Sequence, residues 1–250
     1  MTATTLKVPT ILATSGGLTR GRRTPVGFGP LLHYAIELAG VSGRAPKLCY
    51  VGTATGDQDW RAMQFTEAGR AAGVDVAVLK LFTMPNVDDL AGLVLAQDVV
   101  WVEGGSVANL LALWRLHGLD EVFRQAWRAG VVLSGVSAGS ICWHVGGTTD
   151  SFGPELRPVT NGLGLLPYAN GVHYDAEEQR RPRFHQFVAE GILPGGYATD
   201  DHAGLVYRGT ELAEAVAEVA GQAAYQVSLD HGEVREERLD TRLLPRLDGA

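Results

Sequence analysis

A regular alternation of short apolar runs with helix-length amphipathic segments constrains the fold of this chain more than any other feature. The expected strands cover residues 10–14, 47–51, 74–82, 98–102 and 131–134. The expected helices cover residues 30–39, 59–72, 107–116 and 120–129. Strands that are apolar on both faces and separated by helices form a parallel sheet covered on both sides. The pattern therefore predicts an α/β fold, a three-layer α/β/α sandwich with a mostly parallel sheet.

The second half of the chain follows a different pattern. Residues 148–167 are rich in glycine, proline and threonine, which indicates a long loop with short pieces of strand. One helix and three short strands are expected after it, over residues 176–190, 203–207, 212–217 and 224–229. We interpret these strands as an antiparallel C-terminal extension of the same domain. The expected organisation is one α/β domain over residues 1–235 and a charged tail over residues 236–250.

Composition narrows the class of protein. Hydrophobic residues make up 46% and charged residues 20% of the chain, as in ordinary globular enzymes. The formal net charge of −7 argues against a nucleic-acid partner, because phosphate binding needs a basic surface. The most apolar stretch, residues 90–102, contains Gln97 and Asp98 and is too short to span a bilayer. Neither a nucleic-acid partner nor a membrane partner is expected.

The cysteines and the N-terminus indicate the compartment. Cys49 and Cys142 are the two cysteines, so the chain has neither a disulfide framework nor a clustered zinc-ligand pattern. This usage favours a reducing compartment. The first residues lack the charged region and apolar run of a secretory signal. We expect a cytoplasmic protein that is a monomer or a homodimer.

A G-x-S-x-G motif, Gly135-Val136-Ser137-Ala138-Gly139, directly follows an apolar strand and precedes an expected helix. This is the context of a nucleophile elbow, in which a serine occupies a tight strand-to-helix turn. Small neighbours are needed because the turn has strained backbone angles. The turn lifts the hydroxyl clear of the sheet and directs main-chain amides at the reaction centre. Ser137 is therefore a candidate nucleophile, and the alternative is a glycine-rich turn with an incidental serine.

A serine nucleophile needs a base, usually a histidine that a carboxylate orients. Four of the seven histidines fit this role poorly, because they fall in early helices, along the elbow helix or in the tail: His33, His117, His144 and His231. The residues alone leave three candidates open, His173, His185 and His202. His173 follows the long loop on what we expect to be a short strand.

Three motifs in order resemble those of the peptidase E and cyanophycinase family. The segment 136–143 looks like the nucleophile segment of that family, and Glu103-Gly104-Gly105-Ser106 is similar to its Gly-Gly-Gly-Asn loop. Gly164-Leu165-Leu166-Pro167, followed by His173-Tyr174, resembles the segment that carries the catalytic histidine. The resemblance implies a fold like that of class I glutamine amidotransferases, with serine in place of their cysteine.

The resemblance also implies roles for single residues. Ser137 matches the nucleophile and His173 the general base. Gly105 matches the residue before the family asparagine, whose amide forms half of the oxyanion hole, and Ala138 supplies the other amide. The family needs no metal or organic cofactor. For the third member of the triad, Asp150 comes closest to the family spacing, with Glu155 and Asp201 as alternatives.

Two departures from the family pattern affect the substrate site. Glu103 replaces the first glycine of the loop, and Ser106 replaces the asparagine. Members of the peptidase E type hold the N-terminal aspartate of their substrate with an arginine downstream of the histidine. Arg180 and Arg181 are the candidates for this role, with Arg183 nearby. Their alternative role is a solvated helix face.

The expected function is hydrolysis of short peptides by a serine peptidase of the dipeptidase type, with an N-terminal aspartate as the preferred residue. The proposed triad forms an acyl-enzyme that water resolves. A cyanophycinase-like or broader amino- or carboxypeptidase on the same fold is the nearest alternative. The elbow motif is also compatible with an esterase of the α/β-hydrolase type and with a catalytically silent binding domain.

Overall fold

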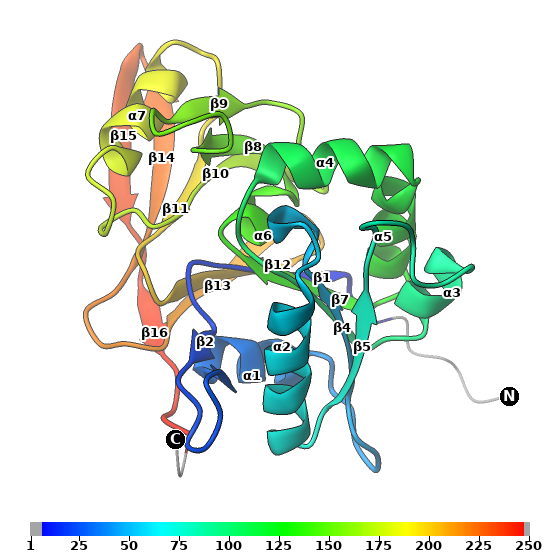
Figure 1. The fold of residues 1–250 in the computed structure, drawn as a ribbon. Helices are drawn as coiled ribbons and strands as arrows, with labels where there is room; N and C mark the ends of the chain where they lie inside the picture. The colour runs from blue at the N-terminus through cyan, green and yellow to red at the C-terminus, as the bar shows by residue number, and fades with distance from the viewer. Residues whose placement is uncertain (1–6, 248–250) are drawn as a thin grey trace, which may run out of the picture.

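An eight-stranded sheet runs through the centre of the computed structural model, which describes residues 7–247 (Figure 1). Its strands are β1 (Thr10–Thr14), β4 (Lys47–Val51), β5 (Asp75–Leu79), β6 (Val99–Val102), β7 (Val132–Val136), β12 (Ala203–Arg208), β13 (Glu211–Ala217) and β16 (Thr241–Leu243). They lie in the order β16-β13-β12-β1-β7-β6-β4-β5. The five strands from β1 to β5 in this order are parallel, whereas β12 is antiparallel to both β1 and β13. Apolar residues on both faces of these strands explain the arrangement.

Helices cover both faces of this sheet. On one face α1 (Pro30–Leu38) and α2 (Asp59–Ala71) pack against side chains such as Leu48 and Trp101. On the other face lie α3 (Leu90–Leu95), α4 (Val107–Leu116) and α5 (Leu119–Arg128). A 3-10 turn, η1 (Thr53–Thr55), and a small hairpin of β2 (Leu18–Thr19) and β3 (Gly27–Phe28) complete this part. The predicted α/β fold with a large, mostly parallel sheet is confirmed.

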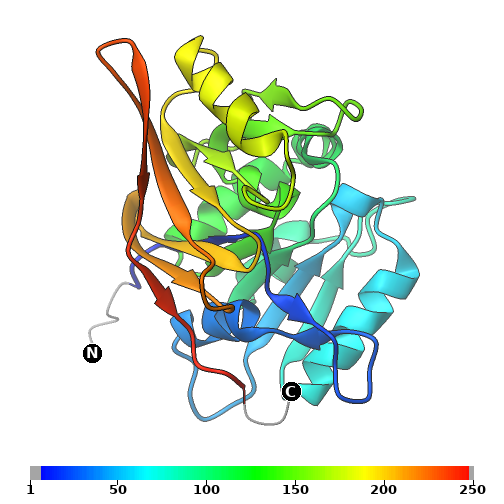
Figure 2. The ribbon, with the colours of Figure 1, turned by 90° about the vertical axis from the view of Figure 1, so that its left-hand side faces the viewer.

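A second, six-stranded sheet stands beside the first. Its strands are β8 (His144–Thr149), β9 (Arg157–Val159), β10 (Leu166–Gly171), β11 (Gly196–Thr199), β14 (Ala224–Asp230) and β15 (Glu233–Arg238). They lie in the order β15-β14-β11-β10-β8-β9, with α7 (Arg180–Ala189) packed against them. Figure 2 shows the long β14–β15 hairpin along one side of the molecule. The range 148–167, expected to be a long loop with short pieces of strand, contains β9 and the adjoining ends of β8 and β10.

The end of the chain belongs to the sheets. The expected domain boundary at residue 235 falls inside β15, and β16 pairs with β13 of the central sheet. Leu244 is 4% exposed and belongs to the same core cluster as Leu31 and Leu32 of α1. The segment 236–247 is therefore part of the folded domain and not a separate tail. Residues 1–6 of the expected domain and residues 248–250 of the expected tail lie outside the described residues. Among the helices of the described chain, none has the length and apolar character needed to cross a bilayer.

The elbow helix is much shorter than expected. Helix α6 (Ala138–Ile141) makes a single turn, so His144 begins β8 and does not lie two turns along a helix. His144 is fully buried, and burial lowers its pKa to about 4. Its Nδ1 lies 2.9 Å from the carbonyl oxygen of Ser140. His144 is a packing residue, in agreement with its exclusion as a base.

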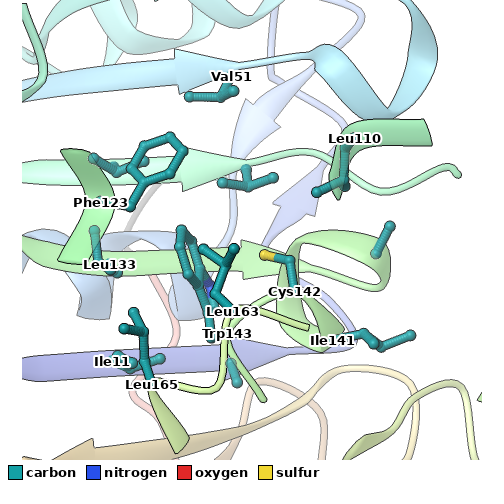
Figure 3. Close-up of a cluster of buried hydrophobic side chains, with 14 of the residues drawn as sticks. Ile11, Val51, Leu110, Phe123, Leu133, Ile141, Cys142, Trp143, Leu163 and Leu165 are labelled. Atoms are coloured by element: carbon teal, nitrogen blue, oxygen red, sulfur yellow. The ribbon is translucent and has the colours of Figure 1, made fainter. Parts of the chain in front are cut away.

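The core joins the two sheets directly behind the elbow. Trp143 is fully buried, packs against Trp114 and Phe123, and belongs to the same core cluster as Leu133, Leu163 and Leu165 (Figure 3). Helix α6 contacts β1, β6 and β7 of the central sheet and β8 and β10 of the second sheet, and it lies between them in Figure 1. Deeply buried apolar contacts of this kind resist displacement. They hold the segment around Ser137 against both sheets.

Candidate active site

Ser137 occupies a strained turn at the end of β7. Its backbone angles are φ 56° and ψ −113°, in a region that residues other than glycine rarely adopt. The Ser137 N–H donates to the carbonyl oxygen of Thr14 at 3.0 Å. The Ser137 carbonyl accepts from the amides of Ser140 and Ile141 at 2.8 and 2.9 Å. Strain that the surrounding bonds maintain is typical of a nucleophile elbow.

The two glycines of the motif are required by close packing on β6. A Cβ on Gly139 would lie 2.2 Å from the carbonyl oxygen of Val102. A Cβ on Gly135 would lie 2.5 Å from the same oxygen and 2.6 Å from that of Gly139. Neither contact is compatible with a side chain. The sequence motif thus reflects a real steric demand of the turn.

His173 follows β10 and forms a pair with Asp201, which lies between β11 and β12. The His173 Nδ1 is 2.5 Å from Asp201 Oδ1. An ionised carboxylate only accepts, so Nδ1 carries the proton and Nε2 keeps its lone pair for a base. The imidazole side chain is 23% exposed and the carboxylate 35%. The pair is therefore open to a substrate and partly shielded from water.

The carboxyl end of β1 anchors both the elbow and the residue that carries the imidazole. Thr14 accepts the Ser137 N–H, and the next residue, Ser15, accepts the His173 N–H at 3.1 Å through its Oγ. Ser137 and His173 are thus hydrogen-bonded to consecutive residues at the carboxyl end of β1. Ligand sites of open α/β sheets lie at this edge.

The structure does not bring Asp150 to His173. Asp150 follows β8 and is exposed, and its carbonyl oxygen accepts the amide of Gly153 at 3.0 Å. Within residues 7–247, neither Asp150 nor Glu155 has a side-chain hydrogen bond to His173. The alternative, Asp201, takes that position. Because β10 and β11 are parallel neighbours, the residues that follow them meet at one edge, a relation that chain spacing does not reveal.

The loop after β6 passes close to the nucleophile. A Cβ on Gly104 would lie 3.1 Å from Ser137 Cβ and 3.8 Å from its Oγ. The next residue, Gly105, has φ +133°, and a Cβ there would lie 2.5 Å from the carbonyl oxygen of Ala54. Across the described chain, the amides of Gly105 and Ala138 have no hydrogen-bond acceptor. They remain available as the predicted oxyanion donors.

The two departures from the family loop have structural explanations. Ser106 is the N-cap of α4, and its Oγ accepts the Asn109 amide at 3.2 Å. Glu103 is 6% exposed, and its carboxylate contacts the Tyr50 hydroxyl and the Arg61 guanidinium. Burial raises the pKa of Glu103 to about 7. Both residues anchor the loop at its ends.

The two arginines expected to bind substrate have partners within the protein. Arg180 is 3% exposed, and its guanidinium donates to Glu177 and to the carbonyl oxygen of Thr148. Arg181 donates to Glu236 at 2.8 Å. Its guanidinium also lies over the rings of Tyr174 and Tyr225, at 4.7 and 4.6 Å from their centroids. These contacts are neither those of a free substrate ligand nor those of a solvated helix face.

The other two candidate bases point to other carboxylates. His185 Nε2 lies 2.8 Å from Glu236. His202 Nδ1 lies 3.0 Å from Glu218, which also accepts the amides of Gly17 and Leu31 near the start of α1. No group of three or more His, Cys, Asp or Glu side chains in residues 7–247 is placed to bind a metal ion.

Comparisons with known proteins agree on one family. A sequence model of peptidase family S51 matches residues 11–215. The chain is 39% identical over 199 residues to the protein called uncharacterized peptidase YgaJ of Bacillus subtilis (strain 168), covering 80% of this chain and 85% of that protein. It is 30% identical over 180 residues to peptidase E of Streptomyces coelicolor, covering 68% of this chain and 72% of that protein.

Solved structures share the fold. A peptidase from an acI-B1 actinobacterium has a TM-score of 0.64 at 16% identity, over 97% of this chain and 98% of its own. A Listeria monocytogenes EGD-e protein assigned to peptidase E has a TM-score of 0.56 at 16% identity, over 93% of this chain and 100% of its own. At this identity the likeness concerns the fold alone.

Proposed function

Since this chain belongs to peptidase family S51 and is a serine-type peptidase, we propose that it hydrolyses short peptides through Ser137, His173 and Asp201. One observation carries the assignment. The His173–Asp201 pair and the strained Ser137 are hydrogen-bonded to neighbouring residues of one strand end. This supports a nucleophile, a base and an orienting carboxylate in the order that acyl transfer requires.

The proposed reaction is acyl transfer from a peptide to Ser137. His173 Nε2 takes the hydroxyl proton while Ser137 Oγ attacks the peptide carbonyl carbon. Asp201 holds the Nδ1–H tautomer and stabilises the imidazolium that forms. The imidazolium then gives its proton to the leaving amine, and water resolves the ester by the reverse sequence of transfers.

The amides of Gly105 and Ala138 are the proposed oxyanion donors. Negative charge develops on the carbonyl oxygen in the tetrahedral intermediate, and a preorganised donor stabilises it by about 3–4 kcal/mol in comparable hydrolases. The space that a Gly104 Cβ would occupy, 3.1 Å from Ser137 Cβ, supports this placement, because it shows that the loop carrying the Gly105 amide passes close to the nucleophile.

We propose the dipeptidase activity and the preference for an N-terminal aspartate on the relationship to peptidase E. The internal partners of Arg180 and Arg181 give this preference no support from those two side chains. A panel of dipeptides that begin with Asp, Asn or Ala tests it. Faster cleavage of the Asp substrates is expected, and equal rates would remove the preference while leaving the peptidase.

Replacement of Ser137 tests the nucleophile. Ser137→Ala is expected to abolish peptide hydrolysis and labelling by a fluorophosphonate probe in a protein that stays folded. Ser140→Ala is the matched control, because it removes a hydroxyl three residues away that bonds Asn170. Wild-type peptide turnover by Ser137→Ala would show that Ser137 is not the nucleophile.

We propose that residues 7–247 form one domain. The chain crosses repeatedly between the two sheets, and β16 returns to the central sheet after β14 and β15 have completed the second. A cytoplasmic location is proposed on the two cysteines, Cys49 and Cys142, which are free and buried. Sedimentation would decide between a monomer and a homodimer.

A further inference from the structure

We propose that Ser15, at the carboxyl end of β1, is the positioning residue that holds His173 and Asp201 in register. This inference rests on the proposed function, since it concerns the base and its carboxylate. Ser15 is 3% exposed and does not itself reach a substrate. Its Oγ accepts the His173 N–H at 3.1 Å and lies 2.7 Å from Thr199 Oγ1.

His173 needs such a contact because its backbone is strained. Its φ is 52°, in the left-handed region that residues other than glycine uncommonly adopt. The Ser15 hydroxyl fixes the amide on one side of this residue. On the other side the amide of Tyr174 donates to the carbonyl oxygen of Thr199 at 3.1 Å. The backbone that carries the imidazole is therefore clamped against β1 and β11.

The main chain of Ser15 holds the carboxylate side of the pair. Its carbonyl oxygen accepts the amide of His202, the residue after Asp201, at 2.9 Å. Its own amide donates to the carbonyl oxygen of Ala203 at 2.9 Å. One residue thus bonds the backbone of the base through its side chain and the loop of the carboxylate through its main chain. Ser15 therefore contributes directly to the separation of His173 and Asp201.

The hydroxyl is the part of this anchor that mutation can remove. Its proton goes to Thr199, through Oγ1 or the carbonyl oxygen at 3.3 Å, which leaves a lone pair for the His173 amide. Without the hydroxyl the His173 amide is left unpaired and the strained backbone relaxes. Displacement of a catalytic group by about 1 Å costs on the order of 100-fold in rate.

The test uses Ser15→Ala and Ser15→Cys, the second of which keeps most of the volume with a weak acceptor. Thr10→Val is the matched control. Thr10 is 2% exposed at the opposite end of β1, and its hydroxyl bonds Val8 and Arg208. We expect both Ser15 variants to lower kcat about 10- to 100-fold with KM changed less than about threefold, and to displace the acid limb of the pH–rate profile. Thr10→Val keeps the wild-type values.

Proton NMR supplies a readout that does not depend on activity. The Nδ1 proton shared by His173 and Asp201 gives a downfield signal, which should shift or broaden in both Ser15 variants and stay unchanged in Thr10→Val. An unchanged signal and profile in both Ser15 variants would overturn the positioning role. A wild-type protein without peptidase activity would overturn the proposed function, and the NMR comparison would still decide the role of Ser15.

Discussion

Replacement of Asp201 by asparagine is the sharpest test of the site. The carboxylate lies 2.5 Å from His173 Nδ1, so the charge centres of the ion pair formed during catalysis are about 4 Å apart. At an effective dielectric constant of about 20, their attraction is about 4 kcal/mol. Because the two side chains are 35% and 23% exposed, we reduce this to about 2 kcal/mol. Loss of that stabilisation lowers kcat about 30-fold.

A second effect separates asparagine from alanine at this position. The asparagine amide can donate to Nδ1, which places the proton on Nε2 and removes the base. Asp201→Asn should therefore lose more than Asp201→Ala, for which about 30-fold is expected. The assay is steady-state hydrolysis of a dipeptide. The comparison variant is Asp150→Asn, because Asp150 is the carboxylate that the chain spacing favoured. A dead Asp150→Asn enzyme beside an active Asp201→Asn enzyme would refute the reasoning.

Three further changes probe the surroundings of the site. Gly139→Ala should lower the free energy of unfolding by about 3 kcal/mol or more in a denaturant titration, because the new methyl would meet the carbonyl oxygen of Val102. Arg181→Ala should cost about 2 kcal/mol of stability through the lost Glu236 pair and ring contacts, while the ratio of rates on Asp and Ala dipeptides stays the same. The pKa of Glu103 is about 7 in the folded protein against an ordinary value of 4.5. Its contribution to the free energy of unfolding is therefore fully present below pH 4.5 and is lost as the pH rises through 7. In denaturant titrations, Glu103→Gln should therefore weaken the pH dependence of the free energy of unfolding between pH 4.5 and 7. The same pH dependence in the wild type and in Glu103→Gln would contradict a raised pKa of Glu103.

Local patterns were sufficient for the central sheet. Strands such as 10–14 and 47–51 are short, apolar and bounded by turn residues, so their extent in the structure matches the prediction. The elbow was equally visible, because its glycines meet a steric demand within a few residues of Ser137. In both cases the information lies within one strand or turn.

The second sheet was not readable in the same way. Its strands β8 and β10 carry glycines and polar residues, and they pair although residues 150–165 separate them along the chain. The short helix α3 was missed because its six residues are nearly all apolar and show no helical alternation of apolar and polar positions. The carboxylate ranked first, Asp150, is not the one that contacts His173, for a related reason. Spacing from Ser137 favoured Asp150, whereas the position of Asp201 depends on the adjacency of β10 and β11.

The site is a product of the contact between the two sheets. Ser137 comes from the end of a central strand, while His173 and Asp201 follow strands of the second sheet. Their relative placement therefore depends on the core behind α6, where Trp143 is fully buried against Trp114 of α4 and Phe123 of α5. Ser15 adds a polar link at the front of the same contact. The core packing around Trp143 and the hydrogen bonds of Ser15 together set the distance between Ser137 and the His173–Asp201 pair. A substitution that leaves a cavity at Trp143 should therefore lower catalysis as well as stability.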